Sequence, residues 1–229
     1  MKTFALAVLA VMLTCPQGLS KPHRASPDGL PDPQAEIARI LRPDFAVQLV
    51  AAAIERTKHD VVYDGSYRRL RYPMGDVPLE IGVCTDLVIR SYRKLGIDLQ
   101  KEVHEDMSAA FQKYPKKWGL SRPDTNIDHR RVLNLEIFFA RKGVEVAVTS
   151  NPEDYFPGDL VTWTVGGSLP HIGIVTDKMS SEGERPLIVH NIGAGPKLED
   201  VLFSLPIVGH FRYAGPGNEE GDSRRWTAN

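Results

Sequence analysis

The fold is decided by the stretch Glu80-Ile-Gly-Val-Cys-Thr-Asp-Leu-Val-Ile-Arg-Ser-Tyr-Arg-Lys-Leu-Gly96. Its second part has apolar or small side chains at helical spacing, at Leu87, Val88, Ser91, Tyr92 and Leu95. Gly82 lets the chain bend sharply, and Gly96 tolerates the left-handed turn that ends many helices. The pattern therefore predicts a helix that begins at Cys84 and ends before Gly96.

Cys84 is the candidate nucleophile of the chain. A cysteine in the first turn of a helix lies beside unpaired backbone N–H groups and the positive end of the helix dipole. Both favour the thiolate, which is the attacking form of cysteine. Free cysteine is also among the most buried residue types, so the alternative role for Cys84 is that of a small apolar core residue.

The N-terminus predicts a secretory signal peptide over residues 1–20. Lys2 precedes an apolar run from Phe4 to Leu13, and the small residues Gly18 and Ser20 stand three and one positions before the expected cut. The run is shorter than the roughly 20 residues that span a membrane. We therefore expect an exported protein, periplasmic or secreted, without an integral membrane segment.

Export leaves one cysteine in the chain. If Cys15 is removed with the signal peptide, Cys84 has no partner for an internal disulfide. An odd cysteine in an exported protein is a candidate reactive thiol. Attachment of a lipid to Cys15 is an alternative, but Thr14 occupies a position where such signals usually have Gly or Ala.

The charges are balanced, with 28 basic and 29 acidic residues among 229. The sequence has no basic field, no interleaving of basic and aromatic residues and no zinc-finger spacing, so nucleic acid is not an expected partner. The chain without its signal peptide is long enough for one domain with a substantial core.

Helical patterns come first in the chain and strand patterns follow. We expect a Pro-rich tether over residues 21–43, a folded domain over 44–214 and a disordered tail over 215–229. Helices are predicted to start at Asp44, Cys84, His104 and Asp128, and strands to cover 144–149, 160–165, 171–176, 186–192 and 207–213. This order predicts an α+β domain in which an antiparallel sheet packs against the helices.

Two histidines stand where a general base is expected. His171 opens one predicted strand and His190 ends the next. Paired side chains on antiparallel neighbours lie about 4.5 to 5.5 Å apart, so one ring can orient the other beside Cys84. A zinc centre made by the same three side chains is the alternative, but no tight pair such as Cys-x-x-Cys occurs. We expect no metal and no cofactor.

A cysteine at a helix start is followed by the turn Gly158-Asp-Leu-Val161, by the run His171-Ile-Gly-Ile-Val175 and by His190 at the end of the next strand. This order resembles the papain-like superfamily, specifically bacterial NlpC-type cell-wall peptidases and CHAP-type amidases. From roughly Tyr63 to Tyr213 the chain is more closely similar to a family of exported bacterial proteins of unknown function related to them. The runs that carry this closer similarity are Gly82-Val-Cys-Thr-Asp-Leu-Val-Ile-Arg90, Asn126-Ile-Asp-His-Arg-Arg131, Leu169-Pro-His-Ile-Gly-Ile174 and Val189-His-Asn-Ile-Gly193.

The resemblance implies a papain-like, NlpC-type fold and a role for each site residue. It makes Cys84 the nucleophile, His171 the base and His190 the orienting third residue. NlpC-type enzymes also have a tyrosine about a dozen residues before the cysteine, whose hydroxyl lies near the oxyanion, and Tyr72 has that spacing here. The backbone N–H of Cys84 is the second expected oxyanion donor.

Four further side chains are candidates for substrate binding. Asp86 lies two residues into the helix, where it either caps the helix or binds a neighbouring ring or a cationic substrate group. The cluster of Asp128, His129, Arg130 and Arg131 is either a solvated helix start or a site for carboxylates, which paired arginines bind well. Peptidoglycan stem peptides are rich in carboxylates, which suit the paired arginines. We therefore predict that Asp86, His129, Arg130 and Arg131 bind the substrate peptide.

The leading hypothesis is an exported cysteine hydrolase that cleaves an amide bond in peptidoglycan stem peptides through a thioester on Cys84. The sequence leaves open whether it is an amidase or an endopeptidase, and whether an inhibitor or immunity-type protein restrains it. One alternative is a thiol acyltransferase or lipid-amide hydrolase of the same fold. Another is a non-catalytic cell-wall binding module, which predicts a buried and unreactive Cys84.

Overall fold

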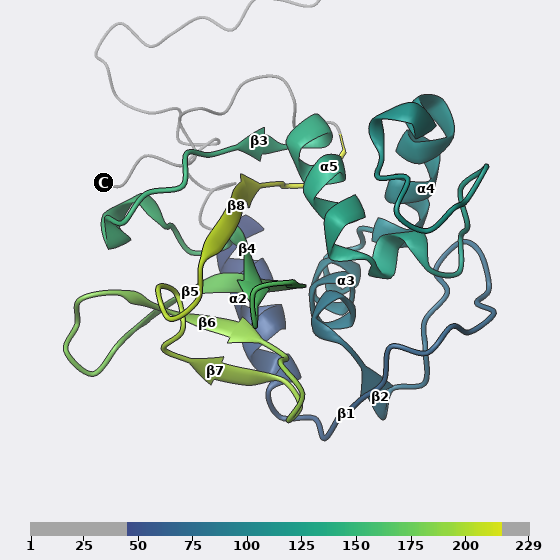
Figure 1. The fold of residues 1–229 in the computed structure, drawn as a ribbon. Helices are drawn as coiled ribbons and strands as arrows, with labels where there is room; N and C mark the ends of the chain where they lie inside the picture. The colour runs from purple at the N-terminus through teal and green to yellow at the C-terminus, as the bar shows by residue number, and fades with distance from the viewer. Residues whose placement is uncertain (1–44, 217–229) are drawn as a thin grey trace, which may run out of the picture. The chain divides into compact units, whose positions relative to one another are not determined.

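The computed structural model describes residues 45–216, which belong to a single structural unit (Figure 1). This unit is a mixed α+β domain in which the main helices precede the strands of an antiparallel sheet. The predicted α+β class is therefore confirmed. The signal peptide, the tether, the Asp44 cap and the tail from residue 217 onward lie outside the described residues.

The α-helices of the described residues are α2 (Phe45–Arg56), α3 (Cys84–Lys94), α4 (Leu99–Ala110) and α5 (Val132–Lys142). Three short 3-10 turns accompany them, η1 (Phe111–Lys113), η2 (Asp128–Arg130) and η3 (Pro152–Asp154). Because α3 begins at Cys84, the predicted cysteine lies in the first helical turn.

Two predicted helix starts need correction. The helix expected at His104 begins at Leu99, because the Asp98 carboxylate caps it by accepting a hydrogen bond from the backbone N–H of Gln100 at 3.1 Å. The helix expected at Asp128 begins only at Val132. Asp128 cannot cap it, since its carboxylate is held by Arg131 and by the backbone N–H of Asp124.

The main sheet has six strands in the order β3-β8-β4-β5-β6-β7, and every neighbouring pair is antiparallel. The strands are β3 (Val144–Glu145), β4 (Leu160–Val165), β5 (Leu169–Met179), β6 (Pro186–His190), β7 (Lys197–Glu199) and β8 (Ile207–Arg212). A separate parallel pair joins β1 (Val62–Tyr63) to β2 (Ile81–Gly82). The prediction for residues 144–149 was too long, and β7 was not predicted.

The sheet has a hydrophobic cluster on each face. Ile172 and Ile174 of β5 contribute to the cluster shared with the helices, which also contains Tyr92 and Phe139. The second cluster consists of Tyr155, Val161, Trp163, Val175, Ile188 and Leu202. Successive side chains of a strand point to opposite faces, so His171 points away from Ile172, toward the face that carries Trp163.

Helix α3 brings Cys84 to β5. Figure 1 shows α2 and α3 next to the strands and α4 farther from them, and α3 packs against both α2 and β5. Every residue from Cys84 to Tyr92 is buried, and the Tyr92 hydroxyl donates a 2.8 Å hydrogen bond to the carbonyl oxygen of Tyr213. These contacts fix the start of α3 relative to the sheet.

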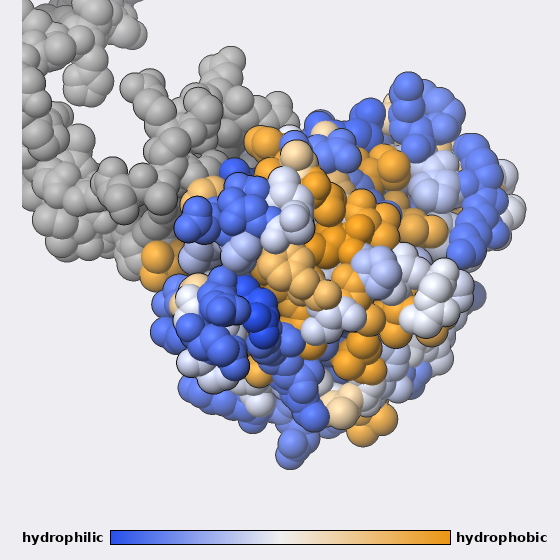
Figure 2. All heavy atoms as spheres, turned by 60° about the vertical axis from the view of Figure 1, so that its left-hand side comes forward, coloured by the Kyte–Doolittle hydropathy of each residue, from blue (hydrophilic) through white to orange (hydrophobic). Residues whose placement is uncertain are grey.

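The surface of the domain also carries apolar side chains. Figure 2 shows an apolar area on the face turned toward the viewer, bordered by hydrophilic side chains. Monomeric proteins commonly expose apolar patches of a few hundred Å². Within residues 45–216, none of the helices combines the length and the apolar character that a membrane span requires.

Candidate functional site

The start of α3 is shaped by its third helical residue. Val83 precedes the helix with an extended backbone. The Asp86 carboxylate reaches back and accepts a hydrogen bond from the backbone N–H of Val83 at 2.7 Å. Asp86 therefore caps the helix that carries Cys84, which is the first of the alternatives considered for it.

The Cys84 thiol lies at the meeting point of α3, β1 and β5. Cys84 is only 3% exposed. The Tyr63 hydroxyl and the backbone N–H groups of Ile172 and Thr85 lie next to its sulfur and act to lower the pKa of the thiol. Burial nevertheless raises the pKa of Cys84 to about 11, and the charge of Asp86 acts in the same direction. Desolvation therefore outweighs the helix start, and the thiol is neutral near pH 7.

The tyrosine that contacts the thiol is Tyr63, not Tyr72. Parallel pairing of β1 with β2 places Tyr63 opposite Gly82, two residues before Cys84. Tyr72 lies in an exposed loop, and its ring packs edge-on against His104 with the centroids 5.1 Å apart. Tyr63 therefore lies beside the thiol, whereas Tyr72 packs on His104 and its predicted role at the oxyanion stays a prediction.

His171 and His190 meet on the face of the sheet that carries Trp163. Gly173 pairs with His190 across β5 and β6, so His171 is the diagonal neighbour of His190. Nε2 of His171 lies 2.9 Å from Nδ1 of His190. Burial lowers the pKa of His171 to about 4, and the neighbouring His190 contributes. Burial also lowers the pKa of His190, so both rings are neutral near pH 7.

Glu199 extends this pair into a chain of three residues. Its Oε2 lies 2.9 Å from Nε2 of His190. β7 pairs with β6 so that Lys197 lies opposite His190, and Glu199, two residues on, faces the same side. Glu199 was not predicted as a site residue, because three residues in a Gly-rich segment give no strand pattern. We call His171, His190 and Glu199 the His–His–Glu chain.

The thiol lies beside the backbone of β5, at the residue that follows His171. The Ile172 N–H that contacts the sulfur belongs to the peptide bond that directly follows His171. The His171 ring lies against Trp163, with ring centroids 5.9 Å apart. Between positions 45 and 216, no hydrogen bond joins the Cys84 thiol to an imidazole. Catalytic hydrogen bonds are often long before substrate binds, so the Cys84–His171 pair stays a prediction.

Asp86 and Arg130 form a buried ion pair, which corrects their predicted role in substrate binding. Nε and Nη2 of Arg130 lie 2.8 and 2.9 Å from the two carboxylate oxygens of Asp86. Arg130 also donates to the carbonyl oxygens of Asp64 and Ser66. The ion pair therefore ties the segment after Tyr63 to the start of α3, and neither charge is available to a ligand.

His129 and Arg131 are also engaged within the protein. His129 is buried, and burial together with the positive charges of Arg130 and Arg93 lowers its pKa to about 3. The Arg131 guanidinium donates to Asp128 at 2.9 Å and stacks on the Trp118 ring, 4.0 Å from its centroid. The predicted carboxylate-binding cluster is therefore a structural one.

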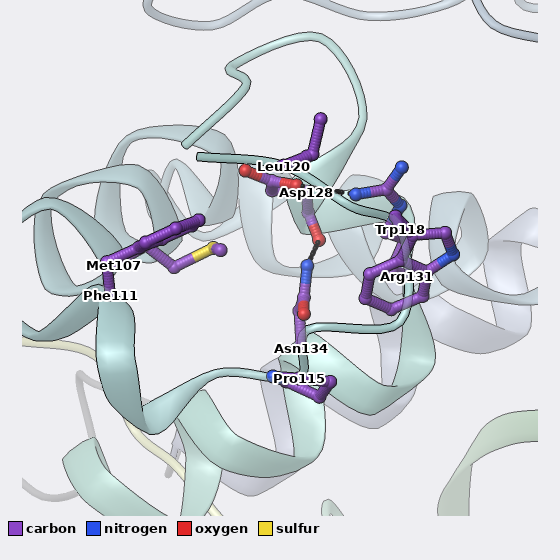
Figure 3. A pocket seen from close by; sticks show the side chains of 8 residues that line it. All are labelled: Met107, Phe111, Pro115, Trp118, Leu120, Asp128, Arg131 and Asn134. Atoms are coloured by element: carbon purple, nitrogen blue, oxygen red, sulfur yellow. Dashed lines mark hydrogen bonds and ion pairs between the residues drawn. The ribbon is translucent and has the colours of Figure 1, made fainter. Parts of the chain in front are cut away.

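A small pocket lies between α4, α5 and the loop that joins them. Figure 3 shows its lining, formed by Met107, Phe111, Pro115, Trp118, Leu120, Asp128, Arg131 and Asn134. Its volume is about 10 Å³, which is room for roughly one water molecule. Asn134 donates to the carbonyl oxygen of Asp128. A pocket of this size does not accommodate a peptide substrate.

The zinc alternative does not fit the geometry of the histidines. Both ring nitrogens of His190 are engaged, Nδ1 with His171 and Nε2 with Glu199. A metal ligand needs a free imidazole lone pair. Across residues 45–216, no group of three or more His, Cys, Asp or Glu side chains is arranged to hold a metal ion.

The fold and the site define an α+β protein with a buried thiol at a helix start and a His–His–Glu chain on an antiparallel sheet. The chain belongs to the family described as "Domain of unknown function (DUF1287)", whose model matches residues 50–213. It is 54% identical over 151 residues to the uncharacterized protein YijF of Escherichia coli (strain K12). The match covers 66% of this chain and 73% of YijF.

Among solved structures the chain is similar to NlpC1 from Trichomonas vaginalis. The TM-score is 0.41 and the sequence identity 13%, over 75% of this chain. The chain spans 45% of the length of NlpC1.

Proposed function

We propose that this protein is an exported cysteine hydrolase of papain-like fold that cleaves an amide bond in the peptide part of peptidoglycan. One observation carries the proposal. The thiol in the first turn of α3 lies beside the backbone N–H of Ile172, and the preceding residue, His171, begins the His–His–Glu chain. A nucleophile, a base and an orienting group thus occur in the order that thiol hydrolysis requires.

The resting site holds a neutral thiol and a neutral imidazole. The pKa of Cys84 is raised to about 11 by burial, and that of His171 is lowered to about 4 by burial. Between these values neither group carries a charge. Attack therefore requires His171 to take the thiol proton as the bond to the carbonyl carbon forms, which is general-base catalysis.

The reaction has two halves. In the first, the sulfur of Cys84 attacks the amide carbonyl and His171 takes the thiol proton. The carbon–nitrogen bond then breaks, the amine leaves with the proton from His171, and a thioester remains on Cys84. In the second half, water attacks the thioester and gives its proton to His171. The acid leaves, and the proton returns to the sulfur.

In the proposed mechanism, two donors stabilise the oxyanion. The Tyr63 hydroxyl lies next to the sulfur, and the backbone N–H of Cys84 is at the first helical position, where it has no partner within the helix. Donors of this kind, aimed where negative charge develops, typically contribute about 10²- to 10³-fold to kcat. Tyr63 thus replaces Tyr72 in the proposed mechanism.

The burial of the thiol favours a second candidate function. A cell-wall binding module that has kept the fold without the chemistry predicts an enclosed, unreactive cysteine, and Cys84 is 3% exposed with a raised pKa. In the hydrolase, the Tyr63 side of the site has to open before a carbonyl reaches the sulfur. β1 and β2 are two residues long each, so this opening breaks few backbone hydrogen bonds.

Digestion of purified peptidoglycan separates the two functions. Wild type, Cys84→Ala and His171→Ala are incubated with sacculi, and the soluble fragments are identified by mass spectrometry. His59→Ala is the matched control, because His59 is exposed and lies outside the site. We expect fragments from wild type and from the control but not from the other two variants. Binding to sacculi without any Cys84-dependent fragment would establish the binding module instead.

A further inference from the structure

The Glu199 carboxylate determines which ring nitrogens of the His–His–Glu chain carry protons. Oε2 of Glu199 lies 2.9 Å from Nε2 of His190. An ionised carboxylate only accepts hydrogen bonds. Nε2 of His190 is therefore the nitrogen that carries a proton.

The assignment continues from His190 to His171. Burial lowers the pKa of His190, so its ring is neutral near pH 7 and, with a proton on Nε2, has a lone pair on Nδ1. That lone pair lies 2.9 Å from Nε2 of His171. The contact is a hydrogen bond only if Nε2 of His171 donates. A neutral His171 then has its own lone pair on Nδ1.

Without the carboxylate, the contact between the rings has no fixed direction. Nδ1 of His190 can donate to Nε2 of His171 as well as accept from it, and either arrangement satisfies the 2.9 Å contact. The reversed arrangement puts the proton of His171 on Nδ1, where it removes the lone pair that a base needs. Backbone pairing of β5 with β6 holds both rings in place either way.

We propose that Glu199 is a positioning residue that fixes the tautomers of His190 and His171, so that Nδ1 of His171 is the nitrogen that accepts the proton of the Cys84 thiol. The part that concerns the thiol rests on the proposed function, whereas the tautomers do not. Glu199 can be substituted to test this role, because its side chain is 39% exposed while that of His190 is buried. Its replacement disturbs no core packing.

Nuclear magnetic resonance tests the proposal without a substrate. Long-range ¹H–¹⁵N correlation spectra distinguish protonated from unprotonated ring nitrogens in ¹⁵N-labelled protein at pH 7. In wild type we expect protons on Nε2 of both His171 and His190. In Glu199→Ala we expect a mixture of tautomers on both rings. Glu184→Ala is the control, since it removes an exposed carboxylate of the β5–β6 connection that contacts Arg185; it should match wild type.

Two spectroscopic results would overturn the proposal: a proton on Nδ1 of His190 in wild type, or unchanged tautomers in Glu199→Ala. The sacculus digestion is then run with the same variants. A wrong tautomer of the base lowers kcat by up to about 10⁴-fold in Ser-His-Asp enzymes, and we expect a loss between about ten-fold and that limit. If the tautomers change in Glu199→Ala but wild type hydrolyses nothing, the proposed function is wrong and the tautomer assignment is still supported. Hydrolysis that Glu199→Ala does not slow would overturn its role toward the thiol.

Discussion

Arg130 and Asp86 form a two-point ion pair with contacts of 2.8 and 2.9 Å, while their side chains are only 2% and 3% exposed. Breaking a buried pair by removing one partner leaves a charge without compensation. This pair links the cap of α3 to the segment that follows Tyr63. It therefore holds the candidate site together without taking part in its chemistry.

Arg130→Met should destabilise the domain by about 3 to 5 kcal/mol, the usual cost of leaving one partner of a buried pair uncompensated. Arg68→Met is the matched control. The Arg68–Asp64 pair is 42% and 28% exposed, and exposed pairs contribute about 0 to 1 kcal/mol. Urea unfolding measures both variants. Equal losses from the two would show that the Arg130 pair is not a structural element.

Cys84 should be alkylated slowly at neutral pH. With a pKa of about 11, the thiolate fraction at pH 7 is roughly 300-fold below that of an ordinary thiol with a pKa of about 8.5. The rate with iodoacetamide is measured from pH 6 to 11, with the urea-unfolded protein as reference. We expect the folded protein to lag and its rate to keep rising above pH 9. Rapid alkylation below pH 7 would instead indicate the thiolate that the helix start alone predicts.

Tyr63→Phe should raise the pKa of Cys84 further, because the Tyr63 hydroxyl is one of the donors that lower it. If the hydrolase proposal holds, kcat should fall about 10²- to 10³-fold, as for other oxyanion donors. Tyr72→Phe is the control, since that ring packs on His104. Thiolate absorbance followed against pH measures the first effect. A larger effect from Tyr72→Phe would restore the assignment made from sequence spacing.

The stability of the domain should fall on acidification below about pH 6.5. The pKa values of His129 and His171 are lowered from 6.5 to about 3 and about 4 by burial. Between these values and 6.5 the unfolded chain binds more protons than the folded one, so stability is full above pH 6.5 and decreases as the pH falls. Each histidine contributes at most about 1.4 kcal/mol per pH unit.

Urea unfolding at pH 7.5 and pH 5 measures this loss. His129→Gln should reduce the difference between the two pH values, because its side chain no longer titrates. His59→Gln is the control, as His59 is exposed. A pH dependence that neither His129→Gln nor His171→Gln reduces would place its origin in other groups.

Export is tested at the N-terminus. If residues 1–20 are a signal peptide, protein recovered from the periplasm or medium should begin at Lys21. A chain that begins at Cys15 and carries lipid would establish the lipoprotein alternative. An intact chain starting at Met1 in the cytoplasm would rule out both forms of export.

Local patterns predicted the parts of the site that depend on local structure. Helical spacing after Cys84 gave the start of α3, and strand patterns around His171 and His190 gave two neighbouring strands whose histidines meet. The start of α4 was also within reach, because Asp98 precedes an apolar helical pattern. The predicted start at His104 did not take the Asp98 cap into account.

Long-range pairing produced the features that the sequence did not reveal. Tyr63 reaches Cys84 because β1 pairs with β2 across an irregular loop. Glu199 reaches His190 through a strand too short to have a pattern of its own. The roles predicted for Asp86 and Arg130 failed for the same reason, since two charges 44 residues apart neutralise each other in the interior. Spacing along the chain carries no information about such encounters.

The neutral state of the Cys84 thiol makes it resistant to oxidation. Peroxides and disulfides react with thiolates, not with thiols, and a pKa of about 11 keeps the thiolate scarce. An unpaired cysteine enclosed in this way resists conversion to sulfenic acid or to a mixed disulfide, even in an oxidising compartment. The same enclosure that makes the sulfur a slow nucleophile at rest would preserve it in reduced form until a substrate arrives.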